Sequence, residues 1–259
     1  MRKVLIIGVG AGNPDYVTIQ AINALNQVDV FFIPNKGTEK EALARLRLDI
    51  CERYIKDRDY RLAGFEMPER SKDPSDYKKN VQDWHSRIEQ NYEKLLLQEL
   101  REGECGAFLV WGDPTLYDST LRIIEKIQAK GDLALEYEVI PGISSIQALA
   151  AKHRIALNRI GDSVHITTGR NLTEGLPNNA DSVVVLLDGE QSFKTIKSND
   201  VDIYWGAYIG TADEILVSGR LSEVMNDIDA IRAKARREKG WIMDTYLLRK
   251  SMTGNKFRP

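Results

Sequence analysis

The sequence predicts an α/β fold made of two α/β domains, and three observations lead to this prediction. Short apolar runs, of which residues 4–8 are the first, are each followed by a turn rich in glycine, proline, aspartate or serine. Strand and helix patterns alternate up to about residue 142, as in a parallel sheet flanked by helices. Beyond this point strand patterns follow one another closely. We therefore expect an N-terminal domain, 1–142, with a mostly parallel sheet, and a C-terminal domain, 143–259, with a mixed α+β sheet.

The N-terminal domain begins with a strand that is apolar on both faces, residues 4–8, which is typical of the inside of a parallel sheet. Thr18 is suited to cap the first helix, which carries Ile19, Ile22 and Leu25 at helical spacing. Further strands are expected at 28–34, 107–111 and 135–140, and further helices at 39–55, 84–102 and 115–130.

The stretch 56–82 is highly charged and contains Pro68, Pro74 and few apolar residues. We expect residues 66–79 to form an exposed loop. Loops of this length are usually functional or disordered, and the sequence leaves both possibilities open.

The C-terminal domain is expected to hold closely spaced strands and few helices. The strands are expected at 164–168, 182–187, 203–208, 215–218 and 241–248, and the helices at 145–153 and 222–239. The basic run 232–239 is most simply explained as a solvated helix face.

Composition excludes several classes of protein. The 36 Lys and Arg residues nearly balance the 38 Asp and Glu residues, so nothing indicates nucleic-acid binding through bulk charge. Two cysteines are too few for a disulfide framework and fit a reducing compartment. The first apolar run is too short for a signal peptide, and no run approaches the ~20 residues that span a bilayer. We expect a cytoplasmic protein without membrane partners.

Three turns predict a binding site. They are residues 8–12, 111–117 and 141–145, and each directly follows an expected strand. Ligands of open α/β sheets bind outside the carboxyl ends of the strands, so these turns should converge on one crevice. Glycines allow close approach of the backbone to a ligand, although a turn that needs positive φ is the simpler alternative. Asp113 could equally bind a ligand or cap the following helix.

Other kinds of site find little support. The first turn fails the dinucleotide pattern G-x-G-x-x-G, because Asn13, followed by Pro14, stands where the last glycine is required. Asn35 and Lys36 stand where the acidic residue that binds ribose is expected. The three histidines lack metal-ligand spacing, and C-x-x-C and H-E-x-x-H are absent, so no metal is expected. Ser144 does not lie in a G-x-S-x-G elbow, which disfavours an acyl-transfer hydrolase.

The turns together resemble the motifs of the tetrapyrrole methylases. The first motif of that family, G-x-G-x-G-x-x-x-x-L-T, is similar to residues 8–18, its G-D-P loop to 112–114, and its P-G-x-[ST]-[SA] turn to 141–145. Residues 208–221 match a fourth block more loosely. Four blocks in the family's order span almost the whole chain, so the resemblance is highly specific. Residues 31–37, 52–55, 165–170, 204–208 and 240–248 are similar to segments of one particular member of that family.

The resemblance implies a class III methyltransferase-like fold, with an active-site trough between the two domains, in a homodimer. It implies S-adenosyl-L-methionine as cofactor, which leaves as S-adenosyl-L-homocysteine, and a precorrin tetrapyrrole as substrate. The implied reaction is methylation at C-1 of precorrin-5 with release of acetate, in cobalamin biosynthesis. A sister methylase that acts on another precorrin position is the alternative.

Site residues follow from the same resemblance. The implied cofactor contacts are Gly8, Gly10, Gly12, Trp111, Gly112, Asp113, Ser144, Ser145, Leu187, Ile209, Gly210 and Thr211. Methyl transfer itself depends mostly on positioning, whereas deacetylation needs water activation or oxyanion stabilisation. Candidates for catalysis are Asp113, Tyr117, Asp15 and Lys36, with His85 as a weaker one. Basic residues suited to the carboxylates of a precorrin are Lys36, Arg154, Arg159 and Arg170, and residues 66–79 could cover the macrocycle as a lid.

Two further classes of function stay open from the sequence alone. A nicotinamide-dependent oxidoreductase would need a different first turn. A binding module that kept the glycine turns would bind the cofactor and transfer no methyl group.

Overall fold

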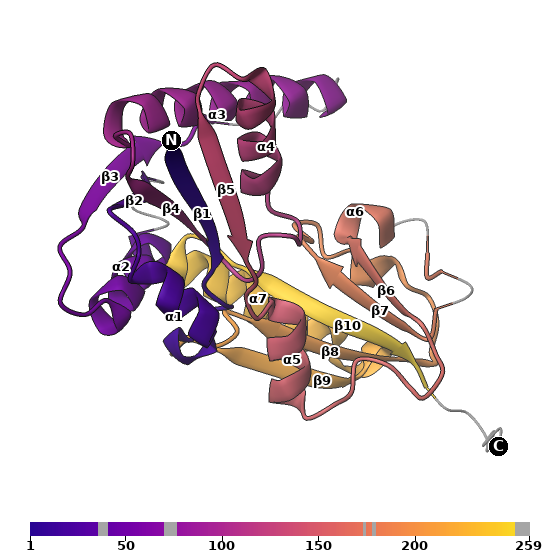
Figure 1. Ribbon diagram of the computed structural model, residues 1–259. Coiled ribbons are helices and arrows are strands. Elements are labelled where there is room, and N and C mark those ends of the chain that lie inside the picture. The colour runs from indigo at the N-terminus through magenta and orange to yellow at the C-terminus, as the bar shows by residue number, and fades with distance from the viewer. Residues whose placement is uncertain (36–40, 70–76, 173–174, 178–179, 252–259) are drawn as a thin grey trace. The chain divides into compact units, whose positions relative to one another are not determined.

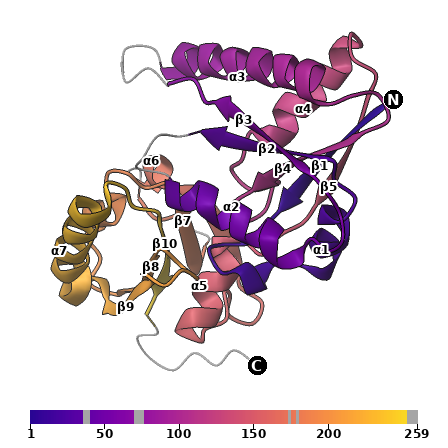
Figure 2. The same cartoon turned by 90° about the vertical axis from the view of Figure 1, so that its left-hand side faces the viewer.

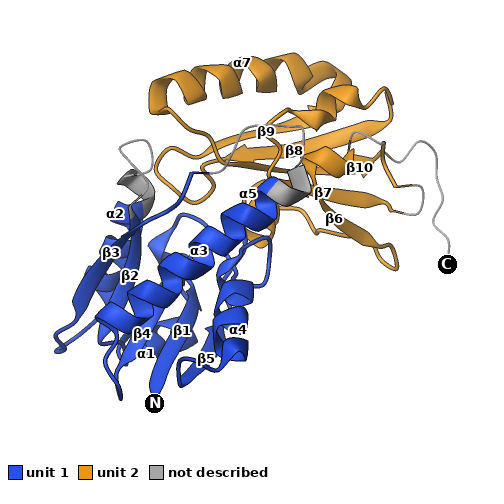
Figure 3. Cartoon of the chain, turned by 90° about the horizontal axis from the view of Figure 1, so that it is seen from above, with its two compact units in different colours: residues 1–144 blue, residues 145–259 orange. Residues whose placement is uncertain are grey.

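The computed structural model describes residues 1–35, 41–69, 77–172, 175–177 and 180–251. The chain divides into two compact units, Met1–Ser144 (unit 1) and Ser145–Pro259 (unit 2), which Figure 3 colours separately. Within the described ranges each unit has one five-stranded sheet. The sheet of unit 1 is parallel and that of unit 2 is mixed, which confirms the predicted fold class.

The sheet of unit 1 has the strand order β3-β2-β4-β1-β5 (Figure 1). Its strands are β1 (Arg2–Gly8), β2 (Val30–Asn35), β3 (Arg61–Glu66), β4 (Cys105–Val110) and β5 (Leu135–Ile140). Because all of them run in the same direction, their carboxyl ends share one edge of the sheet.

Helices cover both faces of this sheet (Figure 2). Val4 and Ile6 of β1 pack in one core cluster with α3 (Tyr77–Glu99) and α4 (Thr120–Lys130). Leu5 and Ile7 pack in a second cluster with α1 (Ile19–Leu25) and α2 (Glu41–Tyr54). Alternate side chains of a strand point to opposite faces, so a strand between two helical layers is apolar throughout. The side chain of Thr18 accepts a hydrogen bond from Ala21 N at 3.1 Å, which confirms the predicted cap of α1.

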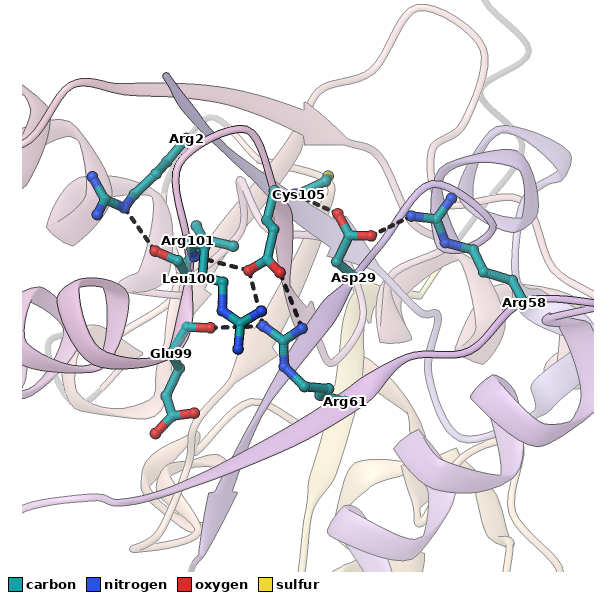
Figure 4. Close-up of polar contacts among 9 residues, drawn as sticks. Arg2, Asp29, Arg58, Arg61, Glu99, Leu100, Arg101 and Cys105 are labelled. Atoms are coloured by element: carbon teal, nitrogen blue, oxygen red, sulfur yellow. Dashed lines mark hydrogen bonds and ion pairs between the residues drawn. The ribbon is translucent and has the colours of Figure 1, made fainter.

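Charged side chains join the amino-terminal edge of the sheet (Figure 4). Asp29, just before β2, accepts a hydrogen bond from Cys105 N at 2.8 Å and pairs with Arg58. The two carboxylate oxygens of Glu104 accept hydrogen bonds from Arg61 at 3.0 and 2.9 Å. The Arg61 guanidinium lowers the pKa of Glu104 to about 2. Ion pairs between side chains therefore help to hold this edge together.

Unit 2 has the strand order β6-β7-β10-β8-β9, in which β6 and β7 are parallel and the other neighbours antiparallel. The strands are β6 (Val164–Thr168), β7 (Ser182–Leu186), β8 (Val201–Ala207), β9 (Ile215–Arg220) and β10 (Asp244–Lys250). The helices are α5 (Ser145–His153), α6 (Gly169–Leu172) and α7 (Leu221–Lys239), and short 3₁₀ turns lie at η1 (Pro14–Tyr16) in unit 1 and η3 (Ser192–Thr195) in unit 2. Trp205, Tyr246 and Phe193 are almost fully buried in the core of unit 2.

Part of the expected loop at 66–79 is regular structure. Glu66 is the last residue of β3, and α3 begins at Tyr77 instead of residue 84. The sequence does not predict the edge strand β3 because only Ala63 and Phe65 face the core, and the other residues of the strand are exposed. Residues 70–76 of the proposed lid lie outside the described residues.

The helix expected from residue 115 begins at Thr120 instead. Tyr117 has a left-handed backbone with φ 53°, which ends any helical path through this segment. The Asp118 carboxylate accepts a hydrogen bond from Thr120 N at 2.7 Å and so satisfies a free donor of the first turn of α4. Among the described residues, no helix is both long enough and apolar enough to cross a membrane.

Candidate functional site

The three predicted turns of unit 1 meet at the carboxyl ends of β1, β4 and β5. The turn after β1 pairs with the turn after β4: Gly112 N donates to Gly10 O at 2.9 Å, and Gly10 N donates to Gly112 O at 3.3 Å. The turn after β5 joins them at Gly142. Successive strand tips therefore close on one another, as the sequence predicts.

Two of the glycines allow the backbone segments to touch. A Cβ on Gly142 would lie 2.1 Å from Gly112 O, and a Cβ on Gly8 would lie 2.6 Å from Gly142 N. Neither clash can be relieved by moving a side chain, because the atoms that would be struck belong to the main chain. Gly10 and Gly12 are favoured for a different reason: their φ values of 81° and 85° lie in the left-handed region, which glycine adopts readily. The rim of these three turns is thus made of closely packed main chain.

Asp113 ties the second turn to the third. Its Oδ2 accepts a hydrogen bond from Gly142 N at 2.9 Å, and its Oδ1 accepts one from Thr115 N at 2.8 Å. The Thr115 hydroxyl also donates to Oδ1. Burial alone would raise the pKa of Asp113, but the hydrogen bonds from Thr115 and Gly142 outweigh it and lower the pKa. The Asp113 side chain thus connects the turn after β4 to the turn after β5 through hydrogen bonds. It does not cap α4, which starts at Thr120.

The other unit 1 candidates for cofactor contact lie on the same rim. Trp111 follows β4 and is half-buried, while Ser144 is buried with 5% of its surface exposed. Gly112 has a left-handed φ of 70°, and a Cβ there would meet only Ser144 Cα, at 3.7 Å. Ser145, the first residue of unit 2, accepts a hydrogen bond from the Thr245 hydroxyl at 3.1 Å.

The catalytic candidates have different surroundings. Tyr117 combines its left-handed backbone with a side chain that is 44% exposed, close behind the G-D-P turn. Asp15 lies in η1 and forms an ion pair with Arg53 at 2.6 Å. Lys36 lies outside the described residues. His85 lies within α3, where its ring packs against Trp84 with centroids 5.2 Å apart.

In unit 2 the four implied cofactor contacts gather at one edge of the sheet. β7 and β8 are both antiparallel to β10, which lies between them, so their carboxyl ends point to the same edge. Leu187 follows β7, has a φ of 53° and is 65% exposed. The turn that contains Ile209, Gly210 and Thr211 follows β8. Within it Gly210 N donates to Glu214 at 2.7 Å, and the Thr211 hydroxyl donates to Tyr208 O at 2.8 Å.

A buried polar network lies beneath this edge, and its members are not among the residues that the sequence predicts for the site. Arg232 was assigned to a solvated helix face, which is wrong, because it is only 5% exposed. Its Nε donates to Asp244 Oδ2 at 3.0 Å, and its Nη2 donates to Asp188 O at 3.1 Å. The signal was available: Arg232 lies four residues after Ile228 and therefore shares the apolar face of α7. Burial raises the pKa of Asp244, while the Arg232 guanidinium opposes this.

Among the described residues, no cluster of histidine, cysteine, aspartate or glutamate is arranged to hold a metal ion. Of the basic candidates for a substrate, Arg159 is already paired with Asp181 and donates to Lys250 O at 2.6 Å. Burial raises the pKa of the Cys51 thiol to about 12 and that of Cys105 to about 11, so neither is an activated nucleophile.

Comparison with known proteins places this geometry in one family. Residues 3–225 match the family model of the tetrapyrrole (corrin/porphyrin) methylases. A precorrin-6A synthase [deacetylating] from a Sinorhizobium species is 55% identical over 250 residues, which cover 96% of each chain. A structure from Corynebacterium diphtheriae, described as a protein related to cobalamin synthesis (CobF), has a TM-score of 0.82 and 35% identity, with 96% of this chain and 99% of that chain covered.

A uroporphyrin-III C-methyltransferase from Thermus thermophilus, solved with S-adenosyl homocysteine, shares the fold. It has a TM-score of 0.56 and 17% identity, with 95% of this chain and 96% of that chain covered. The family model spans most of the sequence, and the matched range includes the three turns that meet at the edge of the unit 1 sheet. This protein therefore belongs to the tetrapyrrole (corrin/porphyrin) methylase family.

Proposed function

We propose that this protein transfers a methyl group from S-adenosylmethionine to C-1 of precorrin-5 and releases the extruded two-carbon unit as acetate, which gives precorrin-6A. The observation that carries the choice of reaction is the 55% identity to a deacetylating precorrin-6A synthase across nearly the whole of both chains. The observation that supports the cofactor is the meeting of three main-chain turns at one sheet edge.

The residues of the rim fit such a cofactor. S-adenosylmethionine carries an ammonium group, a carboxylate and ribose hydroxyls, which bind readily to main-chain carbonyl and N–H groups and to serine hydroxyls. At Gly112 the nearest atom to an added Cβ would be Ser144 Cα at 3.7 Å, which is ordinary van der Waals contact, so the backbone is packed less tightly here than at Gly142. When bound, the cofactor supplies an electrophilic methyl group on a sulfonium.

We assign the holding of the cofactor to the twelve residues named from the family motifs. In unit 1, and at the first residue of unit 2, they are Gly8, Gly10, Gly12, Trp111, Gly112, Asp113, Ser144 and Ser145. In unit 2 they are Leu187, Ile209, Gly210 and Thr211. The work of the chain in methyl transfer is to hold the acceptor carbon in line with the bond that breaks.

For the deacetylation step we assign Tyr117 the leading role, and keep Asp15 and Lys36 as further candidates. Tyr117 is held in a backbone conformation that is costly for a bulky residue, and such residues concentrate at functional sites. Its phenol can donate a hydrogen bond to the oxyanion that forms when water attacks the acyl carbon, before the carbon–carbon bond breaks and the two-carbon unit leaves as acetate. Asp113 is better suited to positioning than to proton transfer, because both of its oxygens already accept hydrogen bonds.

We also propose that the protein acts as a homodimer in the cytoplasm. The homodimer follows from the family resemblance, and light scattering of the purified protein will measure its mass directly. The reducing compartment is supported by two cysteines that are both free thiols.

The decisive experiment combines binding with product analysis. Calorimetry with S-adenosylhomocysteine tests the cofactor site, and anaerobic incubation with S-adenosylmethionine and precorrin-5 tests the reaction. The proposal requires one methyl group added and one acetate released for each turnover. A methylated product without acetate would favour a sister methylase, and binding of the cofactor without any methyl transfer to precorrins would contradict the enzymatic assignment.

A further inference from the structure

The loop after β7, residues 187–191, has an unusual backbone at both ends. Leu187 and Gln191 have left-handed φ values of 53° and 59°, and neither is a glycine. Left-handed backbone at residues with side chains persists only where the surroundings enforce it. Leu187 is also 65% exposed, so its own side chain does not explain the conformation by burial.

Between these two residues lies the carboxylate of Asp188, which is only 4% exposed. Its Oδ2 accepts hydrogen bonds from Ser192 N at 2.6 Å and from the Tyr246 hydroxyl at 2.6 Å. Its Oδ1 accepts a third, from the Ser192 hydroxyl at 3.0 Å. The bonds to Ser192 close the loop across its base, and the bond to Tyr246 anchors it to the centre of β10.

Two further contacts fix the position of Asp188. Its carbonyl oxygen accepts a hydrogen bond from Arg232 Nη2 at 3.1 Å, and Arg232 is in turn held by Asp244 at 3.0 Å. On the other side, Gly169 at the start of α6 packs directly against the carboxylate: a Cβ there would lie 2.2 Å from Asp188 Oδ1. Hence β10, α6 and α7 all determine where this carboxylate lies.

We propose that Asp188 is a positioning residue of the cofactor site, which acts by holding the main chain at Leu187 in its left-handed conformation. This inference rests on the proposed function, in which Leu187 contacts the cofactor. Three buried hydrogen bonds to one carboxylate fix the loop before any ligand arrives. Binding then does not have to order it.

The first test adds bulk without removing any polar group. Gly169→Ala forces the Asp188 carboxylate to move, because the new methyl group would overlap Oδ1. We expect the Kd for S-adenosylhomocysteine to rise about tenfold, equivalent to about 1.4 kcal/mol, with a matching rise in the KM for S-adenosylmethionine and little change in kcat. The control is Gly189→Ala in the same loop, where an added Cβ meets nothing within 4 Å and the Kd should stay unchanged.

The second test separates geometry from charge. In Asp188→Asn the amide oxygen can accept from Ser192 N and Tyr246, while the amide nitrogen donates to the Ser192 hydroxyl. This variant should therefore bind S-adenosylhomocysteine within about twofold of the wild-type protein, whereas Asp188→Ala should lose about tenfold or more. Should Asp188→Ala fail to fold, Tyr246→Phe removes only one of the three hydrogen bonds to the Asp188 carboxylate and should raise the Kd by a smaller factor.

Circular dichroism and thermal unfolding of each variant show that binding is measured on folded protein. The inference is overturned if Gly169→Ala and Tyr246→Phe are folded and bind S-adenosylhomocysteine as tightly as the wild-type protein, since Asp188 would then serve stability alone. It is also overturned if Asp188→Asn loses as much affinity as Asp188→Ala. Failure of the wild-type protein to bind S-adenosylhomocysteine would instead contradict the proposed function.

Discussion

Replacing Gly142 by alanine tests the main-chain rim most directly. The new Cβ would lie 2.1 Å from Gly112 O and 2.8 Å from the carbonyl carbon of Gly8, whereas real Cβ atoms stay beyond 3.0 Å from such neighbours. The turn must therefore move by about 1 Å, and it cannot do so without disturbing its hydrogen bond to Asp113. We expect overpacking to lower the free energy of unfolding by about 2–3 kcal/mol, or roughly 4–12 °C in Tm.

Binding of the cofactor should fall as well, because the atoms that move belong to the proposed site. We expect the Kd for S-adenosylhomocysteine to rise by more than tenfold, measured by calorimetry well below the Tm of the variant. The matched control is Gly131→Ala at the end of α4, where φ is 77° and an added Cβ meets nothing within 4 Å. It should cost about 1 kcal/mol from backbone strain and leave binding unchanged. Equal binding and equal Tm in the two variants would refute the assignment of Gly142 to a close main-chain contact.

Three further predictions address the polar contacts. In Asp113→Asn the side chain can accept through only one oxygen, so we expect the free energy of unfolding to fall by about 1–2 kcal/mol and the binding of S-adenosylhomocysteine to weaken. Because the folded pKa of Asp113 lies below its ordinary value, its stabilising contribution is present at neutral pH and is lost as the pH falls through the lowered pKa; a pH-independent difference in urea denaturation would contradict this. Glu104→Gln should lower the free energy of unfolding by about 1 kcal/mol at pH 7, after allowance for solvent screening around Arg61. The difference from the wild-type protein should disappear as the pH falls from about 4.5 to about 2, and cofactor binding should stay unchanged. Arg232→Met removes the cation that pairs with the buried carboxylate of Asp244, and should lower the free energy of unfolding by about 3–5 kcal/mol in urea denaturation. The control Lys234→Ala, at an exposed position of the same helix, should lower it by less than about 0.5 kcal/mol; equal losses would contradict a stabilising role for the buried ion pair.

The elements that the sequence predicts best are those in which local pattern and tertiary role agree. The bounds expected for β5, α5 and β6 coincide with those observed, because each is a short, regular segment bounded by turn residues. The meeting of the three turns also follows from sequence, since parallel strands necessarily bring their carboxyl ends to one edge. β3 could not be found in the same way, because an edge strand with two inward-facing apolar residues resembles a charged loop.

The role of a polar residue was harder to predict than its place. Asp113 was correctly placed after β4, but its acceptance of a hydrogen bond from Gly142 depends on a partner 29 residues away. Asp188 was overlooked beside Leu187, since its partner Tyr246 lies 58 residues further along the chain. Such contacts depend on the register of whole strands, which no local pattern contains. For Arg232 the local pattern itself is misleading. The run of basic residues predicts an exposed side chain, whereas Arg232 lies on the apolar face of α7 and is buried.

The close packing of Gly8 and Gly142 has a consequence for how such an enzyme can diverge. Peptide groups are chemically the same whatever side chains they carry. A rim made of main chain therefore keeps its hydrogen-bonding groups while the side chains around it change. Residues that recognise the acceptor molecule can then change without altering the main-chain site that we propose for the methyl donor. Attempts to redirect this protein to a different macrocycle should accordingly leave these glycines untouched and vary the bulky neighbours around them.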